Sequence, residues 1–490
     1  MTSPQRQRHL IRVAHRRAGL SVDELWLRYF AMGGTVAPLE LDAYLNEMLD
    51  LPAVERDRLA MAVNEHLDGL VGPRAPYAHG LRAPEARAGT LGALVELLQR
   101  THLAPPDALP AAVAAASRHL RVRTVVYLAD DAKEVLVPVP GPGAEDRRPL
   151  SIDGTLPGRA FRHLEIQPAP AGSDGQARLW VPLIDGVERI GVLDVMTDAD
   201  QDLTDPVLHR QCWWFGHYLG HLVTAMDAYG DALDPVRRNH RRSVQSELIW
   251  QLLPPLTAGT DKVLVSGRIE PSHDMGGDVF DYALSADRAQ FAILDATGHD
   301  LRAGLAAATA VSAYRNARRA GAGLFEQVEA AHRAVSEQFD GQVYATGVVG
   351  ELDLTSGRLR YIAAGHPAPL LVRDGRVVRS LEAGRRPLLG LDVRGTTIGE
   401  EHLQRGDTVA LYTDGITEAR DTEHQQFGVD RLTDTLQRAH AERLPLPEIT
   451  RRVFKAILSH QHDVLQDDAT LLLVRWTTEG QAALDPVPVD

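Results

Sequence analysis

Hydrophobic side chains recur at helical intervals through residues 1–70. Ser21 and Glu24 have the spacing of a capping box and stand directly before one apolar stripe. Pro38 opens a second periodic stretch, and Pro52 separates it from a third. The pattern predicts an N-terminal helical segment of three helices.

Residues 71–88 contain three prolines and two glycines without periodicity, which predicts a linker. From 89 to 229 the pattern changes to two helical stretches, several strand-like runs and a closing helix over 205–229. This order predicts an α/β domain, a sheet with its helices on one side. The strand-like runs cover 123–128, 134–139, 179–184 and 189–195.

Residues 230–258 predict a connecting helix. Val244, Leu248 and Leu252 recur every four residues, and Pro254 ends the helix. A single apolar stripe on a polar helix needs a partner. A short dimer contact and packing on a neighbouring domain explain this stripe equally well, because it is under three heptads long.

Acidic residues follow or precede apolar strand-like runs at four places between 259 and 477. Burying a carboxylate without a partner is costly, and several that converge need a cation. Oxygen ligands select magnesium, manganese or calcium. Any one of these acids taken alone is explained by turn chemistry. The four segments are 275–281, 291–300, 408–415 and 466–473.

Composition restricts the classes of partner. The formal net charge of −14 argues against a general nucleic-acid binder, and acidic residues in the N-terminal segment disfavour a DNA-reading module there. The sequence has no long apolar run for a membrane span and no secretory signal. With Cys212 as the single cysteine, an intramolecular disulfide is excluded, so we expect a cytoplasmic protein.

The region 89–229 resembles a GAF sensor domain. The resemblance rests on the loop SIDGTLPGRAF (151–161) and on the strand pair RLWVPLIDGVERIGVLDV (178–195). In the family, such a loop lines a pocket and such strands form a central hairpin. Asp185-Gly186 is indeed a hairpin-turn signal. The ligand of this GAF-like domain stays open.

The region 259–477 resembles the PPM-type metal-dependent serine/threonine phosphatases, in their SpoIIE/RsbU-like bacterial branch. The resemblance implies an αββα sandwich of two antiparallel sheets flanked by helices, within an α+β multidomain chain that ends in a tail, 478–490. The matching segments, in family order, are GGDVFDY, LDATGHD, AAGHPAPLLVRDG, LLGL, GDTVALYTDGITEA, FGVDRL and DDATLLLVR.

The resemblance also implies a centre of two Mn²⁺ or Mg²⁺ ions. Carried over by motif, Asp278 and Asp295 would be shared ligands, the Ala296 carbonyl would complete one shell, and Asp414 and Asp467 would hold the other ion. A water between the ions would attack the phosphomonoester, so no side chain is needed as a nucleophile.

Several residues near these motifs are harder to place. Asp468 is expected to be a structural acid beside the favoured Asp467. Asp300 replaces a common glycine, and we expect it to tolerate a positive φ and to cap the helix that follows. His299 is a weak candidate for a general acid, Arg268 is a weak candidate for a phosphate ligand, and His366 is expected to be a structural turn residue.

These features favour a phosphatase that acts on phosphoserine or phosphothreonine of a regulatory protein. In the family this partner is usually an anti-sigma-factor antagonist of the STAS type. The GAF-like domain would regulate the phosphatase through the connecting helix, which would dimerise or rotate. The alternatives are a non-catalytic signal-sensing scaffold that docks partners and, less favoured, a DNA-binding regulator.

Overall fold

The computed structural model describes residues 4–67, 89–171, 175–197, 203–238, 242–270, 276–298, 300–391, 395–462 and 465–477. The expected linker (71–88), the expected tail (478–490) and His299 lie outside the described residues. The chain divides into two compact units, Met1–Arg87 and Ala88–Asp490.

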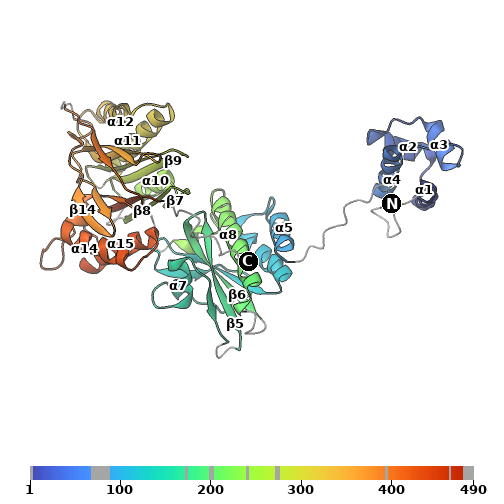
Figure 1. Cartoon of the computed structure of the whole chain (residues 1–490), viewed down its shortest axis with the longest axis horizontal. Helices are drawn as coiled ribbons and strands as arrows, with labels where there is room; N and C mark the ends of the chain where they lie inside the picture. Colours follow the sequence, from blue (N-terminus) through green and yellow to red (C-terminus); the bar gives the residue numbers. More distant parts are fainter. Residues whose placement is uncertain are drawn as a thin grey trace. The chain divides into compact units, whose positions relative to one another are not determined.

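The first unit contains four helices in its described part, not the expected three (Figure 1). The additional helix precedes Ser21. Its narrow buried stripe, which includes Ile11 and Ala14, is set among arginines and is therefore weak in a periodicity analysis. The capping box of Ser21 and Glu24 is confirmed in full. The helices are α1 (Pro4–Ala18), α2 (Val22–Ala31), α3 (Pro38–Leu45) and α4 (Ala53–Leu67).

The elements from Gly89 to Asp227, which we call the middle domain, are built on a six-stranded sheet in the order β3-β2-β1-β6-β5-β4. The predicted strands and the hairpin at Asp185-Gly186 are confirmed. Its elements are α5 (Gly89–Thr101), η1 (Pro106–Ala108), α6 (Leu109–Ser117), η2 (Arg118–Leu120), β1 (Arg123–Ala129), β2 (Val135–Pro138), β3 (Leu150–Ser151), α7 (Leu156–His163), β4 (Gln167–Ala169), β5 (Ala177–Asp185), β6 (Glu188–Thr197) and α8 (Pro206–Asp227).

Helices cover both faces of this sheet, so the expectation that they lie on one side is wrong. Helices α5, α6 and α8 enclose one apolar cluster with alternate residues of β1, such as Val126. Helix α7 encloses a second cluster with the other set, such as Val125, and with its own Phe161. Because successive strand residues point to opposite faces, the buried run of β1 already required two covers.

The connecting segment forms α9 (Asp234–Arg237) and α10 (Val244–Leu252). Ile249 of α10 is fully buried in the core of the C-terminal domain, and Leu252 packs against that core. Val244, by contrast, is 76% exposed. Packing on a neighbouring domain therefore accounts for part of the stripe.

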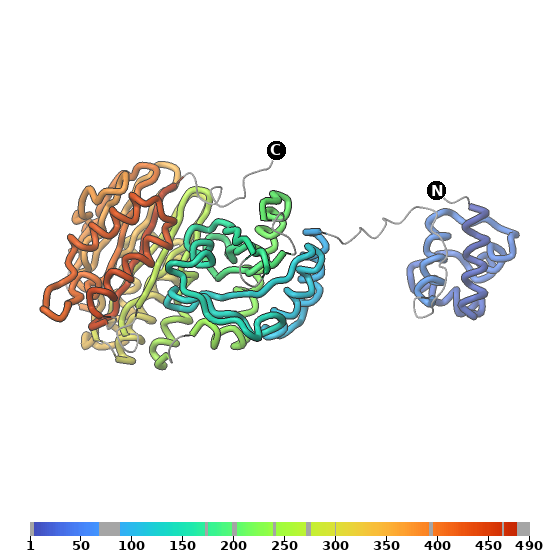
Figure 2. Tube along the Cα trace, turned by 90° about the horizontal axis from the view of Figure 1, so that it is seen from below, coloured from blue at the N-terminus to red at the C-terminus, as the bar shows by residue number. Residues whose placement is uncertain are grey.

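The C-terminal domain, which runs from β7 at Thr257 to Trp476, contains two sheets that face each other across one core, with helices outside both, as expected for an αββα sandwich. One sheet has the order β15-β12-β11-β10-β9, with β16 beside β12, and the other has the order β14-β13-β17-β18-β8-β7. Helices α11 and α12 pack on the first sheet, and α15 packs on the second with α14 beside it (Figures 1 and 2).

The expectation of purely antiparallel sheets needs one correction. The short strand β15 pairs with β12 in parallel, because it returns to the sheet after the β13–β14 hairpin. The strands of this domain are β7 (Thr257–Gly259), β8 (Val263–Glu270), β9 (Asp278–Leu284), β10 (Arg288–Ala296), β11 (Ala345–Asp353), β12 (Arg358–Ala364), β13 (Leu370–Arg373), β14 (Arg376–Ser380), β15 (Arg385–Arg386), β16 (Gly399–His402), β17 (Thr408–Tyr412) and β18 (Ala469–Trp476). The helices are α11 (Leu301–Arg319), α12 (Leu324–Phe339), α13 (Asp414–Thr417), α14 (Gly428–Ala441) and α15 (Leu446–His460).

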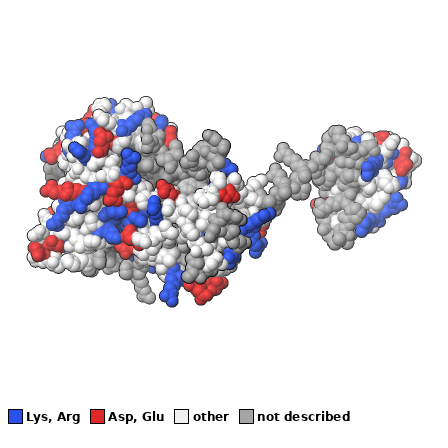
Figure 3. Space-filling view, turned by 60° about the horizontal axis from the view of Figure 1, so that its bottom comes forward, with Lys and Arg blue, Asp and Glu red and all other residues white. Residues whose placement is uncertain are grey.

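The surface carries both signs of charge. On the face shown in Figure 3, lysine and arginine side chains are interspersed with aspartate and glutamate. Within the described residues, no helix combines the length and the apolar character that crossing a bilayer requires.

Candidate metal centre

The predicted acids meet where the two sheets of the C-terminal domain end. Asp278 begins β9 and is paired in register with Asp295, near the end of β10. In the facing sheet, β17 ends just before Asp414, and β18 begins just after Asp467 and Asp468. β17 and β18 are antiparallel neighbours, so the end of one lies beside the start of the other. Four segments far apart in sequence thus converge.

Two threonines that the sequence analysis missed join the two sheets at this point. The hydroxyl groups of Thr413 and Thr470 donate hydrogen bonds of 2.9 and 2.5 Å to Oδ2 of Asp278, which is only 2% exposed. Each threonine stands next to or near an acid in its motif, Thr413-Asp414 and Asp468-Ala469-Thr470. That adjacency was the available signal.

Asp467 and Asp468 have different surroundings. Asp468 is buried, and its Oδ2 accepts a hydrogen bond of 2.6 Å from the backbone N–H of Gly276. Asp467 is exposed, and its Oδ1 accepts from the backbone N–H of Asp468 at 2.8 Å. Asp468 therefore holds the glycine loop in place, while Asp467 presents a carboxylate to solvent.

Two glycines allow the backbone to approach closely here. A Cβ on Gly277 would lie 2.0 Å from the carbonyl oxygen of Ala296, and a Cβ on Gly415 would lie 1.9 Å from that of Asp468. Any side chain at these positions would push the strand ends apart. The Ala296 carbonyl therefore lies directly against the loop that precedes Asp278.

Without a bound cation, the negative charges of the acid cluster are unfavourable because they are buried and close together. Burial, together with the charges of Asp295 and Asp468, raises the pKa of Asp278 well above its usual range. Burial and the charges of Asp414, Asp467 and Asp468 raise the pKa of Asp295 to about 7. Burial and Asp467 also raise the pKa of Asp414. Carboxylates that destabilise each other in this way are stabilised by a bound cation.

The donor set fits Mg²⁺ or Mn²⁺, because it consists of carboxylate and carbonyl oxygens. Within the described part of the chain, no three His, Cys, Asp or Glu side chains are already arranged to hold an ion. The residues that would hold an ion are Asp278, Asp295, Asp414, Asp467 and the Ala296 carbonyl.

Neighbouring residues have structural roles. Arg268 bonds to Glu270 at 2.6 Å and stacks on Phe454, which ties it to the helix side of its sheet. Asp300 caps α11 by accepting from the backbone N–H groups of Arg302 and Ala303, as expected. Its φ is −104°, so the expected positive φ is wrong; Gly298 takes that conformation, at +101°.

Asp281 is a further buried acid that the sequence analysis did not single out. It lies three residues after Asp278 on β9 and is 2% exposed. Arg315 and Arg318 of α11 each reach it at 2.7 Å. The same Arg315 donates to the carbonyl of Leu252, at the end of α10. One arginine thus connects the connecting segment, α11 and the strand that carries Asp278.

Comparison with known proteins shows which family and which proteins the C-terminal domain resembles. Residues 285–477 match the family model described as Stage II sporulation protein E (SpoIIE). The phosphoserine phosphatase RsbU of Bacillus subtilis is 23% identical over 281 residues, which cover 53% of this chain and 79% of that protein. Protein IcfG of Synechocystis is 28% identical over 141 residues, covering 28% of this chain and 22% of that protein.

Among solved structures, the chain is similar to the RsbU and RsbW domains of Rv1364c from Mycobacterium tuberculosis. The sequences are 28% identical, the TM-score is 0.41, and the match covers 46% of this chain and 62% of that one. The family match shows that residues 285–477 of this chain form a protein phosphatase domain of the SpoIIE type, similar to RsbU.

Proposed function

We propose that the protein hydrolyses phosphoserine or phosphothreonine on a regulatory protein, with two Mn²⁺ or Mg²⁺ ions held by the acid cluster. The observation that carries the proposal is the convergence of Asp278, Asp295, Asp414 and Asp467 at one end of the sandwich, where burial and the neighbouring carboxylates raise the pKa values of Asp278, Asp295 and Asp414. The family match over the same domain supports it.

The residues of this chain would contribute to the reaction by positioning the charged groups that hold the metal ions. The metal ions, when bound, would polarise the phosphoryl group and lower the pKa of the attacking water. Thr413 and Thr470 hold Asp278 in a fixed orientation, and Gly276 is fixed by Asp468. Orientation of this kind is what outer groups contribute at metal sites.

The substrate class follows from the relatives. RsbU is named a phosphoserine phosphatase. We therefore propose a phosphorylated partner protein for this chain, and specifically an anti-sigma-factor antagonist of the STAS type, as in the family that the motifs resemble. Incubating the full-length protein with phosphorylated STAS proteins and measuring phosphate release would test this; release from none of them would contradict it.

Metal dependence is the first test of the activity. The full-length protein should hydrolyse p-nitrophenyl phosphate with Mn²⁺ and lose that activity with a chelator, and Asp414→Asn should remove it. Calorimetric titration should show Mn²⁺ binding by the unmodified protein. A folded protein that neither binds Mn²⁺ nor hydrolyses the ester would instead support the non-catalytic scaffold.

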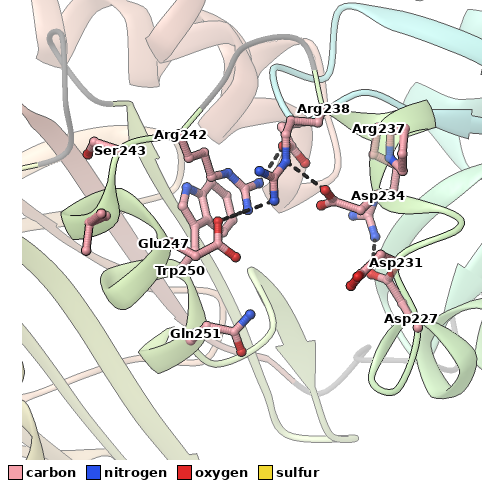
Figure 4. A pocket seen from close by; sticks show the side chains of 14 residues that line it. Asp227, Asp231, Asp234, Arg237, Arg238, Arg242, Ser243, Glu247, Trp250 and Gln251 are labelled. Carbon is pink, nitrogen blue, oxygen red and sulfur yellow. Dashed lines mark hydrogen bonds and ion pairs between the residues drawn. The ribbon is translucent and has the colours of Figure 1, made fainter.

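Regulation is proposed to pass from the GAF-like middle domain through the connecting segment. Asp131 of the middle domain pairs with Arg242 at 2.5 Å, and Arg242 stacks on Trp250 of α10. These residues line a charged cavity of about 700 Å³, in which Arg238 lies between Asp234 and Glu247 (Figure 4). A movement of the middle domain would therefore pull on α10.

From α10 the signal would reach the acid cluster through Arg315, which bonds to Leu252 and to Asp281. The exposed Val244 leaves part of the α10 stripe free for a second copy of the chain, so we propose a homodimer through this helix. Size measurement by light scattering would test that state; a monomer at all working concentrations would contradict it.

Arg315→Gln should lower the turnover of p-nitrophenyl phosphate by roughly 2- to 30-fold, because coupling residues of this kind contribute about 0.5–2 kcal/mol. The substitution removes the link between α10, α11 and β9 without touching the acid cluster. Arg319→Gln, on the exposed end of the same helix, is the matched control and should change turnover little. Equal effects of the two substitutions would argue against the proposed route.

A further inference from the structure

The ligands proposed for the metal ions come from both sheets of the C-terminal domain. Asp278 and Asp295 lie on the first sheet, whereas Asp414 and Asp467 adjoin β17 and β18 of the second. The spacing between the sheets at this end therefore decides whether the four carboxylates can reach the same ions. On the side of Asp278, two threonine hydroxyl groups at strand ends of the second sheet hold that spacing. The side of Asp295 needs a link of its own.

The chain crosses from the first sheet to the second at this end, in the segment 365–369 that joins β12 to β13. Gly365 begins the crossing with a φ of +62°, a conformation that favours glycine, and its N–H donates to the carbonyl of Arg386 at 3.0 Å. His366 follows and is only 9% exposed. A buried polar ring is costly unless it is hydrogen-bonded, so its partners indicate its role.

The partner of the His366 ring is a threonine that neighbours Asp295. Oγ1 of Thr346 lies 2.7 Å from Nδ1 of His366. Thr346 on β11 is paired in register with Asp295 on β10, so the two side chains share one face of the sheet, with Cβ atoms about 4.5–5.5 Å apart. That face is turned toward the second sheet, because Asp278, the partner of Asp295 on β9, bonds to the threonines there. The His366–Thr346 hydrogen bond therefore lies between the sheets, beside Asp295.

His366 also lies against the second sheet. Burial lowers the pKa of its ring to about 4, and a hydrogen bond to the backbone of Tyr412 opposes this shift only in part. The ring is therefore uncharged at neutral pH and does not repel a cation nearby. Tyr412 is the last residue of β17, two positions before Asp414. One imidazole thus joins the neighbour of Asp295 in the first sheet to the strand end that carries Asp414.

We propose that His366 is a positioning residue of the metal centre. Through Thr346, it fixes the strand end that carries Asp295 at a set distance from the one that carries Asp414. The role rests on the proposed phosphatase function and adds to it a residue that touches neither the ions nor the substrate. Replacing groups that only orient metal ligands typically costs roughly 10- to 100-fold in metal affinity. Mn²⁺ binding is therefore the property that His366 and Thr346 should control.

Thr346→Val tests the proposal, because it removes the hydroxyl and keeps nearly the same side-chain shape. Calorimetric titration of the full-length protein should show an affinity for Mn²⁺ that is lower by roughly 10- to 100-fold. The Mn²⁺ concentration that gives half-maximal hydrolysis of p-nitrophenyl phosphate should rise by a similar factor. Thr346→Ser, which keeps the hydroxyl, should bind Mn²⁺ more tightly than Thr346→Val. An unchanged Mn²⁺ affinity in Thr346→Val would overturn the proposal.

Thr450→Val is the matched control for a loss of stability alone. Its hydroxyl is buried and lies 3.0 Å from that of Ser266, between α15 and β8. Both valine variants should lower the free energy of unfolding in urea without metal, because each loses a buried hydrogen bond. Only Thr346→Val should weaken Mn²⁺ binding. Equal weakening in the two variants would show that the His366–Thr346 hydrogen bond serves the fold in general, and the positioning role would be wrong.

Substitution of the ring completes the test. His366→Leu removes its hydrogen bonds, whereas His366→Asn keeps an amide close to the position of Nδ1 and should retain more affinity for Mn²⁺. Because His366→Leu and Thr346→Val break the same hydrogen bond, the double variant should bind Mn²⁺ about as weakly as the weaker single variant. Fully additive losses would contradict a shared role. If His366→Leu does not fold, the two Thr346 variants and the Thr450→Val control decide the question.

The outcomes separate the two proposals. If the unmodified protein neither binds Mn²⁺ nor hydrolyses p-nitrophenyl phosphate, the proposed function fails and the positioning role fails with it. If the unmodified protein does both, and Thr346→Val binds Mn²⁺ equally well, only the positioning role of His366 is wrong.

Discussion

Asp278→Asn should abolish phosphatase activity and, in the absence of metal, should make the protein more stable. The loss of activity should exceed the 10- to 100-fold typical of groups that only orient metal ligands, because Asp278 is proposed to be shared by both ions. The gain in stability is expected because a buried carboxylate beside Asp295 and Asp468 opposes folding, while an amide oxygen still accepts from Thr413 and Thr470.

The gain in stability expected for Asp278→Asn should depend on pH, and its direction follows from the pKa of Asp278. The folded-state pKa of Asp278 is raised above the ordinary carboxyl value, so its proton is retained on folding and lost on unfolding. Stability of the metal-free protein should therefore fall as pH rises above about 4. Asp278→Asn should reduce that fall, and its advantage should be larger at pH 7 than at pH 4.

Phosphate release and urea unfolding with and without Mn²⁺ measure both effects. Asp434→Asn, an exposed acid on α14, is the control and should change neither. Mn²⁺ should stabilise the unmodified protein much more than Asp278→Asn. A variant that keeps its activity, or that is less stable than the unmodified protein without metal, would contradict the proposed role of Asp278.

Glu448→Gln should destabilise the protein by about 3–5 kcal/mol, the cost of removing one partner from a buried ion pair. Glu448 of α15 is fully buried and accepts from Arg189 of the middle domain at 3.0 Å and from Arg451 at 2.9 Å. Burial opposes its charge, but the hydrogen bonds from Arg451 and the charge of Arg189 hold its pKa below the usual value. Without that charge, the buried Arg189 loses the carboxylate to which it is bonded, and Arg451 is left with Asp153.

This contact continues across the surface between the middle and C-terminal domains. Arg451 also bonds to Asp153 at 2.6 Å, in the loop that resembles a GAF pocket loop, and Arg189 stacks on Phe161 of α7. Glu448→Gln should therefore also expose the junction to proteolysis. Urea unfolding measures the stability, and Glu442→Gln, which affects an exposed pair with Arg452, should cost less than about 1 kcal/mol. Similar effects of the two substitutions would contradict the assigned role of the network.

The candidate metal centre was predictable to a large extent, because its ligand positions are local patterns. Each acid stands where an apolar strand begins or ends, with a glycine or threonine within three residues of it. Such patterns survive in the linear sequence. The motif order then implied which acids belong together. The hydrogen bonds that orient Asp278 were not predictable, because they join residues more than 130 positions apart.

The fold was predictable where one face of an element is buried and less so elsewhere. The capping box at Ser21 and the hairpin at Asp185-Gly186 follow from neighbouring residues alone. Helix α1 was missed because its buried stripe is narrow, and α7 was missed because its eight residues are too few for periodicity. Strands buried on both faces likewise do not reveal which helix covers each face.

By itself, the sequence determined the strand ends that carry acids, the helix caps and turns, and the phosphatase family of the C-terminal domain, since all of these depend on residues close together in the chain. Only the tertiary structure decided that Glu448 neutralises Arg189, 259 positions away, and that Arg386 lies buried and pairs with Glu329 of α12. Partners of this kind depend on strand register and domain packing. Many arginines have similar local surroundings, so the identity of the one that becomes buried is settled only when the chain folds.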